Sequence, residues 1–292
     1  MIGTAISMLH GALTGDIGGP MPPVGMRVRG ALAEWIFFAV NTAIFGGASI
    51  YAIVHSLRAR TWIPVMCMIG GAMCIFTEAM VDSHLLVWWP THEQPDAFVG
   101  FGRHIPLMVI PIVGWYFGLG TYVRWAYLQK MGARLPVWIV YLGEVGAAIC
   151  LEPPAISLDL WHYFGEQGLR FFGYPIWWPF VGGACGVVAG TLIYKLTPYF
   201  AGARVLLVPL LIPMGVVAVY WSAGLPMFNV LNFNPTATWI NYVAAFASIG
   251  LALLVVWICT IATGHHEYRQ SRKHSRTADG TQPELATAAT TR

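Results

Sequence analysis

Charged residues are scarce in this chain. Asp, Glu, Lys and Arg together make up 10% of its 292 residues, whereas hydrophobic residues make up 57%. A soluble globular domain typically carries roughly 25% charged residues. The composition therefore excludes an ordinary soluble domain and predicts an integral membrane protein. The net charge of +3 is small and gives no reason to expect nucleic acid as a partner.

Motifs that would indicate a cofactor are also missing. No GxGxxG or P-loop pattern opens a helix after a predicted strand, and the histidines do not recur at metal-ligand spacing. The five cysteines show no CxxC spacing and fall within apolar runs, so we expect reduced core residues. We therefore expect no cofactor and no metal. The N-terminal 25 residues lack a secretory signal pattern, so the first span is expected to direct insertion.

Long apolar runs dominate the remainder. About 20 apolar residues cross the hydrocarbon core of a bilayer as a helix, and the sequence contains seven candidates. We predict an all-α fold, a bundle of seven transmembrane helices in one membrane domain over residues 30–264. The predicted spans are 31–56, 62–84, 105–128, 136–153, 174–196, 205–223 and 237–263.

The basic residues predict the orientation of this bundle. Lys and Arg accumulate in the cytoplasmic loops of membrane proteins, and twelve of the sixteen basic residues fall on one side of the predicted spans. This places residues 1–29 outside the cytoplasm and residues 265–292 inside it. The polar C-terminal segment is predicted to be a disordered cytoplasmic tail, with its basic start on anionic lipid. We expect a multi-pass protein of the cell membrane.

Acidic residues within the spans are the main indication of function. An ionised side chain near the bilayer centre costs roughly 2.5–3.5 kcal/mol on insertion scales, so such residues usually face a cavity or a partner. Glu78 and Asp82 are four residues apart and therefore share one helix face. Crowded carboxyl groups in a low dielectric tend to retain a proton, which suits a general acid beside a charged neighbour.

A third acidic residue marks the end of the predicted fourth span. Glu152 precedes Pro153 and Pro154, which disfavour a regular helix, so we expect the helix to end or break at Glu152. Irregular backbone at membrane depth is tolerated where it lines a cavity. The segment 150–164 is therefore predicted to form a re-entrant or interfacial cavity wall.

These residues define a predicted site in the extracytoplasmic half of the membrane. The predicted catalytic residues are Glu78, Asp82, Glu152 and Asp159. The predicted substrate-binding residues are Glu34, His84, Trp88, Arg103, His104, Glu144, Trp161, His162, Tyr174, Trp177 and Trp178. Structural roles are open alternatives: the acids can pair with arginines, the tryptophan pairs can form interfacial belts, and Glu144 can join helices. Glycine pairs at 70–71 and 182–183, and the Gly186–Gly190 pattern, predict close helix packing.

Five segments resemble a known family. TEAMVDSHLLVWWP (77–90), FGRHIPLMVIPIVGWYFG (101–118), LEPPAISLDLWHYFG (151–165), LLIPMGVVAVYWSAGLP (210–226) and above all GYPIWWPFVGG (173–183) are similar to the AveC-like spirocyclase family. The resemblance covers most of the chain between about residues 30 and 260. The resemblance implies a membrane enzyme that forms spiroketals in the biosynthesis of polyketides, which are secondary metabolites. A dehydratase activity is also attributed to members of the family.

The acidic residues and the resemblance predict one chemistry. Spiroketal closure needs a proton donor, loss of water to an oxocarbenium ion, capture by a hydroxyl group and a proton acceptor. We assign the acid role to Glu78 or Glu152 and the base or cation-stabilising role to Asp82, with Trp88, Trp177 and Trp178 excluding water. The expected partners are a hydrophobic small-molecule substrate and membrane lipid.

Two rival functions use the same residues. A membrane terpene cyclase would protonate an alkene or epoxide and give an isomer of its substrate. A transporter of a lipid-like molecule would use the acids as a proton relay or to bind an amine. The two halves of the chain share no motifs, and internal repeats would have favoured a transporter.

Overall fold

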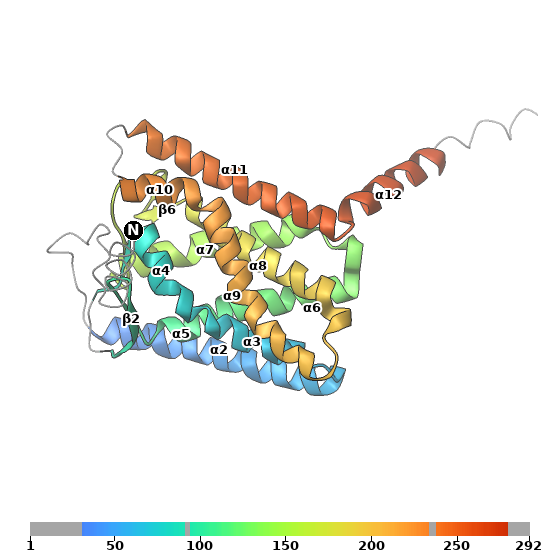
Figure 1. The fold of residues 1–292 in the computed structure, drawn as a ribbon, viewed down its shortest axis with the longest axis horizontal. Helices are drawn as coiled ribbons and strands as arrows, with labels where there is room; N and C mark the ends of the chain where they lie inside the picture. The colour runs from blue at the N-terminus through green and yellow to red at the C-terminus, as the bar shows by residue number, and fades with distance from the viewer. Residues whose placement is uncertain (1–30, 91–93, 234–237, 280–292) are drawn as a thin grey trace, which may run out of the picture.

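The computed structural model describes residues 31–90, 94–233 and 238–279. Helices make up most of this part, and they lie roughly along one direction in a bundle (Figure 1). The predicted N-terminal segment 1–29 and the last part of the predicted tail, 280–292, lie outside the described residues. The long helices are α2 (Ala31–Ala59), α7 (Val137–Ser157), α8 (Trp177–Leu196), α9 (Val208–Ala223) and α11 (Trp239–Ala262).

Five helices in the described part of the chain are long and apolar enough to cross a membrane. A sixth candidate consists of α3 (Ile63–Met73) and α4 (Ile75–Leu85), which bend by 42° at Cys74. The prediction of a mainly helical membrane protein is confirmed, with five or six candidate spans in the described residues. The predicted span 105–128 is interrupted, because a π-helix, η1 (Gly114–Leu119), separates α5 (Val109–Val113) from α6 (Gly120–Met131).

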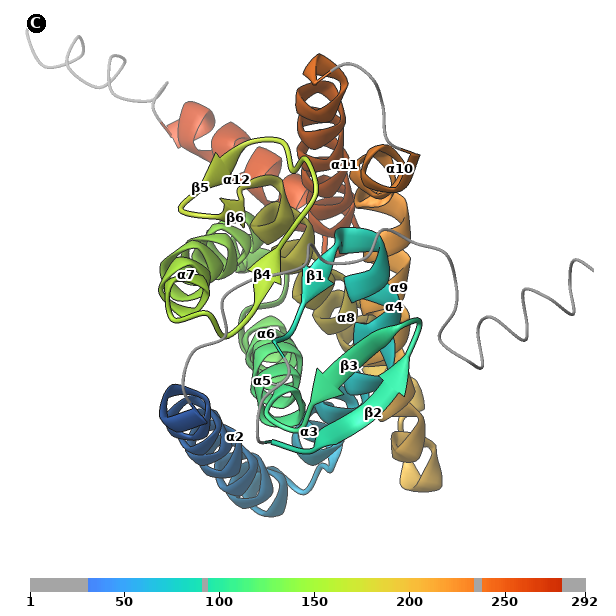
Figure 2. The same ribbon diagram turned by 90° about the vertical axis from the view of Figure 1, so that its left-hand side faces the viewer.

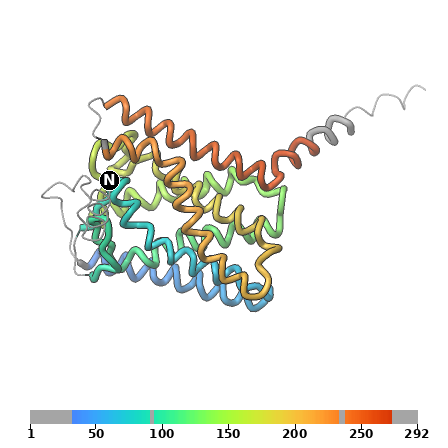
Figure 3. The backbone as a smooth tube through the Cα atoms, in the orientation of Figure 1, coloured from blue at the N-terminus to red at the C-terminus, as the bar shows by residue number. Residues whose placement is uncertain are grey.

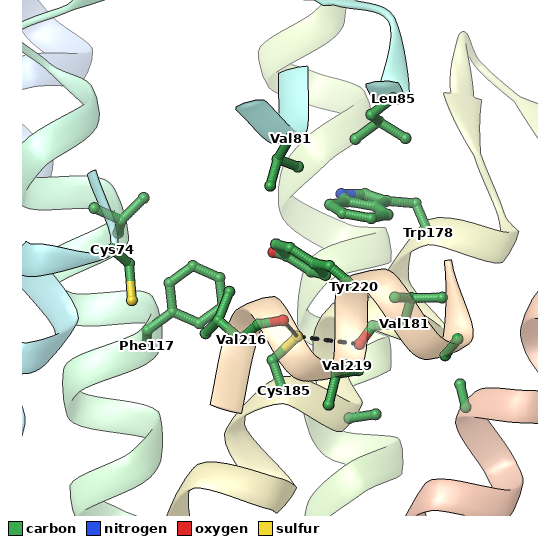
Figure 4. Packing of buried hydrophobic residues seen from close by; sticks show 14 of the residues in the cluster. Cys74, Val81, Leu85, Phe117, Trp178, Val181, Cys185, Val216, Val219 and Tyr220 are labelled. Atoms are coloured by element: carbon green, nitrogen blue, oxygen red, sulfur yellow. Dashed lines mark hydrogen bonds between the residues drawn. The ribbon is translucent and has the colours of Figure 1, made fainter. Parts of the chain in front are cut away.

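Helix α8 occupies the centre of the bundle. It packs against α6, α7, α9 and α11, whereas α2 and α11 lie on opposite sides (Figure 1). Figure 4 shows the contact between α8 and α9, where the Trp178 and Tyr220 rings pack at a tilt of 33° with their centroids 4.7 Å apart. The Cys185 thiol bonds to the carbonyl of Val181 on its own helix and, at 3.9 Å, to that of Val216 on α9. Four of the five cysteines are buried as predicted, but Cys150 is exposed.

Glycines allow the closest helix contacts, as the sequence predicted. A Cβ at Gly71 would lie 2.4 Å from the backbone nitrogen of Gly118 and 2.5 Å from the carbonyl oxygen of Gly114. Those two glycines belong to the π-helix, so α3 and η1 approach backbone to backbone. At Gly190 a Cβ would lie 2.7 Å from the Arg124 side chain. Small residues therefore determine where α3 and α8 can pack.

In the described part of the chain, three short two-stranded antiparallel sheets, which were not predicted from the sequence, cover one end of the bundle (Figure 2). Strand β1 (Val87–Trp88) pairs with β4 (His162–Tyr163), with Val87 opposite Tyr163. Strand β2 (Asp96–Gly100) pairs with β3 (Arg103–Pro106), and β5 (Arg170–Phe171) pairs with β6 (Tyr174–Pro175). The β1–β4 pair joins the chain after α4 to the chain after α7. We call this end of the molecule the cap.

The remaining helices are α10 (Leu225–Phe233), which follows α9, and α12 (His265–Asp279) at the opposite end from the cap. Helix α12 begins where the sequence predicted a disordered tail, and it leaves the bundle after a bend (Figure 3). His265 anchors its start, since the Nδ1 atom lies 2.7 Å from the carbonyl oxygen of Ala133. Short 3₁₀ helices of one turn, Gly132–Arg134 and Thr197–Tyr199, and of two turns, Gly202–Leu207, complete the connections.

Candidate functional site

A cavity of about 350 Å³ lies beneath the cap, within the range of small-molecule sites. Most of its wall is apolar or aromatic, and three carboxyl groups interrupt that wall: Glu78, Asp82 and Glu152. Trp161, Tyr174 and Trp178 line it as well. Six of the fifteen predicted site residues are therefore brought together around one space.

The bend between α3 and α4 places the first two carboxyl groups. Helix α4 begins after Cys74, so Glu78 lies in its first turn and Asp82 one turn later, on the shared face that the spacing predicted. Asp82 is buried and accepts a hydrogen bond of 2.6 Å from the indole nitrogen of Trp89. The chain after α4 therefore folds back so that Trp89 donates a hydrogen bond to the carboxylate of Asp82 on that helix.

The third carboxyl group comes from the far side of the cavity. The Glu152 Oε2 atom accepts hydrogen bonds from the Trp161 indole at 2.8 Å and from the Tyr163 hydroxyl at 3.2 Å. Both donors follow α7 in the cap. Part of the predicted wall segment 150–164 thus lines the cavity, through Leu151 and Glu152 at the end of α7 and Trp161 and Tyr163 in the cap.

The expected break at Glu152 is wrong. Helix α7 continues through Pro153 and Pro154 to Ser157. A proline inside a helix loses its own N–H donor, and its ring crowds the carbonyl group four residues earlier, but its φ is near the helical value, and these two prolines lie within the last five residues of α7. The amide of Leu158, the C-terminal cap of α7, still makes a helical bond of 3.0 Å to the carbonyl of Pro154. Glu152 consequently projects from a regular helix.

Glu78 differs from the other two carboxyl groups. Among the described residues, none donates a hydrogen bond to its side chain, although both Asp82 and Glu152 are close enough to act on it electrostatically. Asp82 and Glu152 are held as acceptors by indole N–H groups. Glu78 is the carboxyl group in this cavity that is left to face a ligand.

A buried arginine balances part of this negative charge. Arg103 on β3 lies with its guanidinium carbon 5.3 Å from the centroid of the Phe164 ring. Burial lowers the pKa of Arg103, and the nearby Asp82 carboxylate raises it. Arg103 does not line the cavity, but it supports Asp82 from the cap.

Two cap tyrosines complete the polar wall. Tyr163 and Tyr174 are buried, their rings are 5.6 Å apart, and both line the cavity. Burial raises the pKa of both phenols well above the usual range, and the nearby Glu152 adds to this effect. Both therefore remain neutral hydroxyl groups, able to donate a hydrogen bond.

The structure places the other predicted residues elsewhere. Trp88 stacks on His162, whose Nε2 atom lies 3.7 Å from Asp159, so these three form a separate group in the cap. His84 contacts Trp221 and the carbonyl of Met80. None of these four cap or helix-end residues lines the cavity.

Five further predictions are also located outside the cavity. Glu34 and His104 line a second, more polar pocket, where His104 lies 2.8 Å from Asp96. Trp177 is fully buried and donates to Gln167 at 3.3 Å. Arg103 and Glu144 complete this set. Glu144 forms an ion pair of 3.0 Å with the buried Arg124, nearer the other end of the bundle.

Several residues that line the cavity were not predicted from the sequence. Tyr116 and Trp115 reach the cavity from the π-helix, Tyr220 from α9, and Trp89 and Tyr163 from the cap. A π-helix shifts the helix face by about one residue and is frequent at functional sites.

The described residues contain no group of three or more His, Cys, Asp or Glu side chains arranged to hold a metal ion. Comparison of the chain with family models, curated proteins and solved structures finds no match. The resemblance to the spirocyclase family therefore stays a prediction.

Proposed function

We propose that this protein is a membrane-embedded, cofactor-independent cyclase or dehydratase that acts on a hydrophobic hydroxy-ketone. The observation that supports this most directly is the convergence of Glu78, Asp82 and Glu152 on one aromatic cavity. A site that both donates and accepts a proton needs two carboxyl groups in different environments. The hydrogen bonds to Asp82 and Glu152, and the absence of a described donor to Glu78, supply that difference.

The topology belongs to the same proposal. We count α5, η1 and α6 as a seventh span, because together they run through Val109–Met131 beside α3 and α8. With the basic residues on the cytoplasmic side, the cap then lies outside the cytoplasm and α12 inside it. The cavity opens in the outer half of a multi-pass protein of the cell membrane.

In the proposed reaction Glu78 is the acid. It donates its proton to the hydroxyl oxygen of a hemiketal. The bond between that oxygen and the ketal carbon then breaks, which releases one water molecule and forms an oxocarbenium ion. A second hydroxyl group of the substrate attacks that carbon, and its proton passes to a carboxylate, Asp82 or Glu152. Transfer of a proton back to Glu78 closes the cycle. The net change is loss of one water, and no oxidant or reductant is needed.

The aromatic wall suits this intermediate. The faces of tryptophan and tyrosine attract a cation by roughly 0.5–2 kcal/mol, and Trp178, Tyr220 and Trp161 all line the cavity. Asp82 and Glu152 add negative charge. An apolar enclosure also limits capture of the cation by bulk water. These roles replace those predicted for Trp88 and Trp177, which lie outside the cavity.

The test uses mass spectrometry of lipid extracts from cells that lack the protein and from cells restored with it or its variants. Glu78→Gln should accumulate a compound heavier than the restored product by one water. Asp159→Asn is the matched control, since it makes the same change of carboxyl to amide outside the cavity and should restore the product. Equal turnover by Glu78→Gln would contradict the assignment.

The rival functions give different results in the same extracts. A substrate and product of equal mass would indicate an isomerising terpene-type cyclase. A compound that changes only its distribution across the membrane would indicate transport. Both rival functions would use the same cavity. The mass and the location of the accumulated compound therefore identify the function, whereas loss of activity in the carboxyl variants shows only that the cavity is used.

A further inference from the structure

The cap closes the cavity toward the aqueous side. Trp89 and Trp161 pack with ring centroids 5.1 Å apart, and each of them is 7% exposed. Trp161 also contacts Phe37 of α2 edge to face at 5.7 Å. Tyr163 and Tyr174 are buried beside them. A molecule dissolved in water meets aromatic side chains that are already packed against one another.

One side of the cavity is different. Val40 and Ile44 on α2 and Leu151 on α7 line the cavity, yet they are 51%, 42% and 54% exposed. Figure 2 shows α2 and α7 as neighbours on the perimeter, with α5 toward the interior. Because these helices qualify as membrane spans, the surface between them faces lipid. The cavity therefore reaches the acyl chains below the Phe37–Trp161 contact.

A hydrogen bond fixes the inner edge of this opening. The indole nitrogen of Trp115 on the π-helix donates to the Asn41 side-chain oxygen at 2.8 Å, and the Asn41 amide donates to the carbonyl of Phe37. Both polar groups of Asn41 are thus used, so the rim is effectively apolar. The carboxyl groups lie farther in, on α4 and the end of α7.

We propose that the substrate enters from the bilayer through this opening between α2 and α7. The opening selects a lipid-dissolved molecule with an apolar body, and the carboxyl groups within select a carbonyl or hydroxyl group at its leading end. This inference rests on the proposed function for the identity of the reacting group. It does not depend on turnover, because entry alone can be measured.

The test uses the full chain in liposomes with a long-chain fatty alcohol that carries an alkyl diazirine. Photolysis of such a diazirine alkylates nearby carboxyl groups, and peptide mass spectrometry locates the label. Labelling is expected at Glu78, Asp82 or Glu152. Leu151→Trp and, independently, Val40→Trp add bulk at the opening and should reduce that labelling several-fold. The two blocking variants lie on different helices, so the test still holds if one of them fails to fold.

Ile139→Trp is the matched control. Ile139 also lies on α7 and is 69% exposed, but it does not line the cavity, so this variant should label like the unaltered protein. Unchanged carboxyl labelling in both blocking variants would overturn the proposal. So would absence of cavity label in the unaltered protein, or equal labelling by a membrane-impermeant sulfonated diazirine. A labelled cavity in a protein without turnover would retain the entry route and reject the cyclase.

Discussion

Trp89 donates its indole N–H to the Asp82 carboxylate across 2.6 Å, seven residues after it in the chain. The contact spans the end of α4, where Leu86 adopts a left-handed conformation with φ of 59° and turns the chain back into β1. The carboxylate that we propose takes part in the reaction and the indole that orients it therefore belong to one local segment. This links the shape of the cap to the protonation chemistry of the cavity.

Trp89→Phe should weaken both stability and turnover. The ring is retained but the donor is lost, and a buried acceptor without a partner costs about 1–3 kcal/mol. Thermal unfolding in detergent should show a lower midpoint, and product formation in cells should fall. Trp88→Phe is the control, because Trp88 stacks on His162 outside the cavity. Equal losses in both variants would show that the hydrogen bond has no special role.

The two donors to Glu152 should behave as a unit. Trp161→Phe and Tyr163→Phe each leave one hydrogen bond on the same oxygen, so each single variant should be mild. The double variant leaves that oxygen without a described donor and should lose more than the sum of the two. Unfolding midpoints and product yield of the four proteins measure this coupling. Simple additivity would contradict a shared role.

Tyr174→Phe is the matched control for that cycle. Tyr174 lines the same cavity and packs on Tyr163, but no hydrogen bond links it to Glu152. Its removal should leave the coupling between Trp161 and Tyr163 unchanged. A change in coupling would place Tyr174 within the same network.

The sequence predicted the parts of this site that follow from local spacing. Glu78 and Asp82 share a face because four residues make about one helical turn. Glu152 was predicted at the extracytoplasmic end of the fourth span, at the same side of the membrane as the other two acids. Tyr116 was not predictable, because its position depends on the π-helix. Asp159, Trp161 and His162 were placed together in a predicted loop over the cavity. Around strand β4, however, successive side chains point to opposite faces, so Trp161 and Tyr163 line the cavity and His162 does not.

Gly71→Ala should be strongly destabilising. The added Cβ would lie 2.4 to 2.5 Å from backbone atoms of Gly114 and Gly118, and backbone cannot move aside as a side chain can. Overpacking typically costs about 1–3 kcal/mol and occasionally more. Folded yield and unfolding midpoint should both fall. Gly46→Ala on α2 is the control, since nothing lies within 4 Å of its added carbon. Similar behaviour of the two variants would refute the close contact of α3 with η1.

Glu144→Gln should affect stability more than catalysis. Arg124 is 1% exposed, and its Nε and Nη1 atoms have no hydrogen-bond partner among the described residues, so Glu144 supplies its main counter-charge. Removing one partner of a fully buried pair costs about 3–5 kcal/mol. The Glu144 side chain is 23% exposed, which places the expected loss toward the low end. The unfolding midpoint should fall, whereas product formed per folded molecule should be retained. A variant of normal stability that forms no product would instead return Glu144 to the substrate-binding residues, among which the sequence alone had placed it.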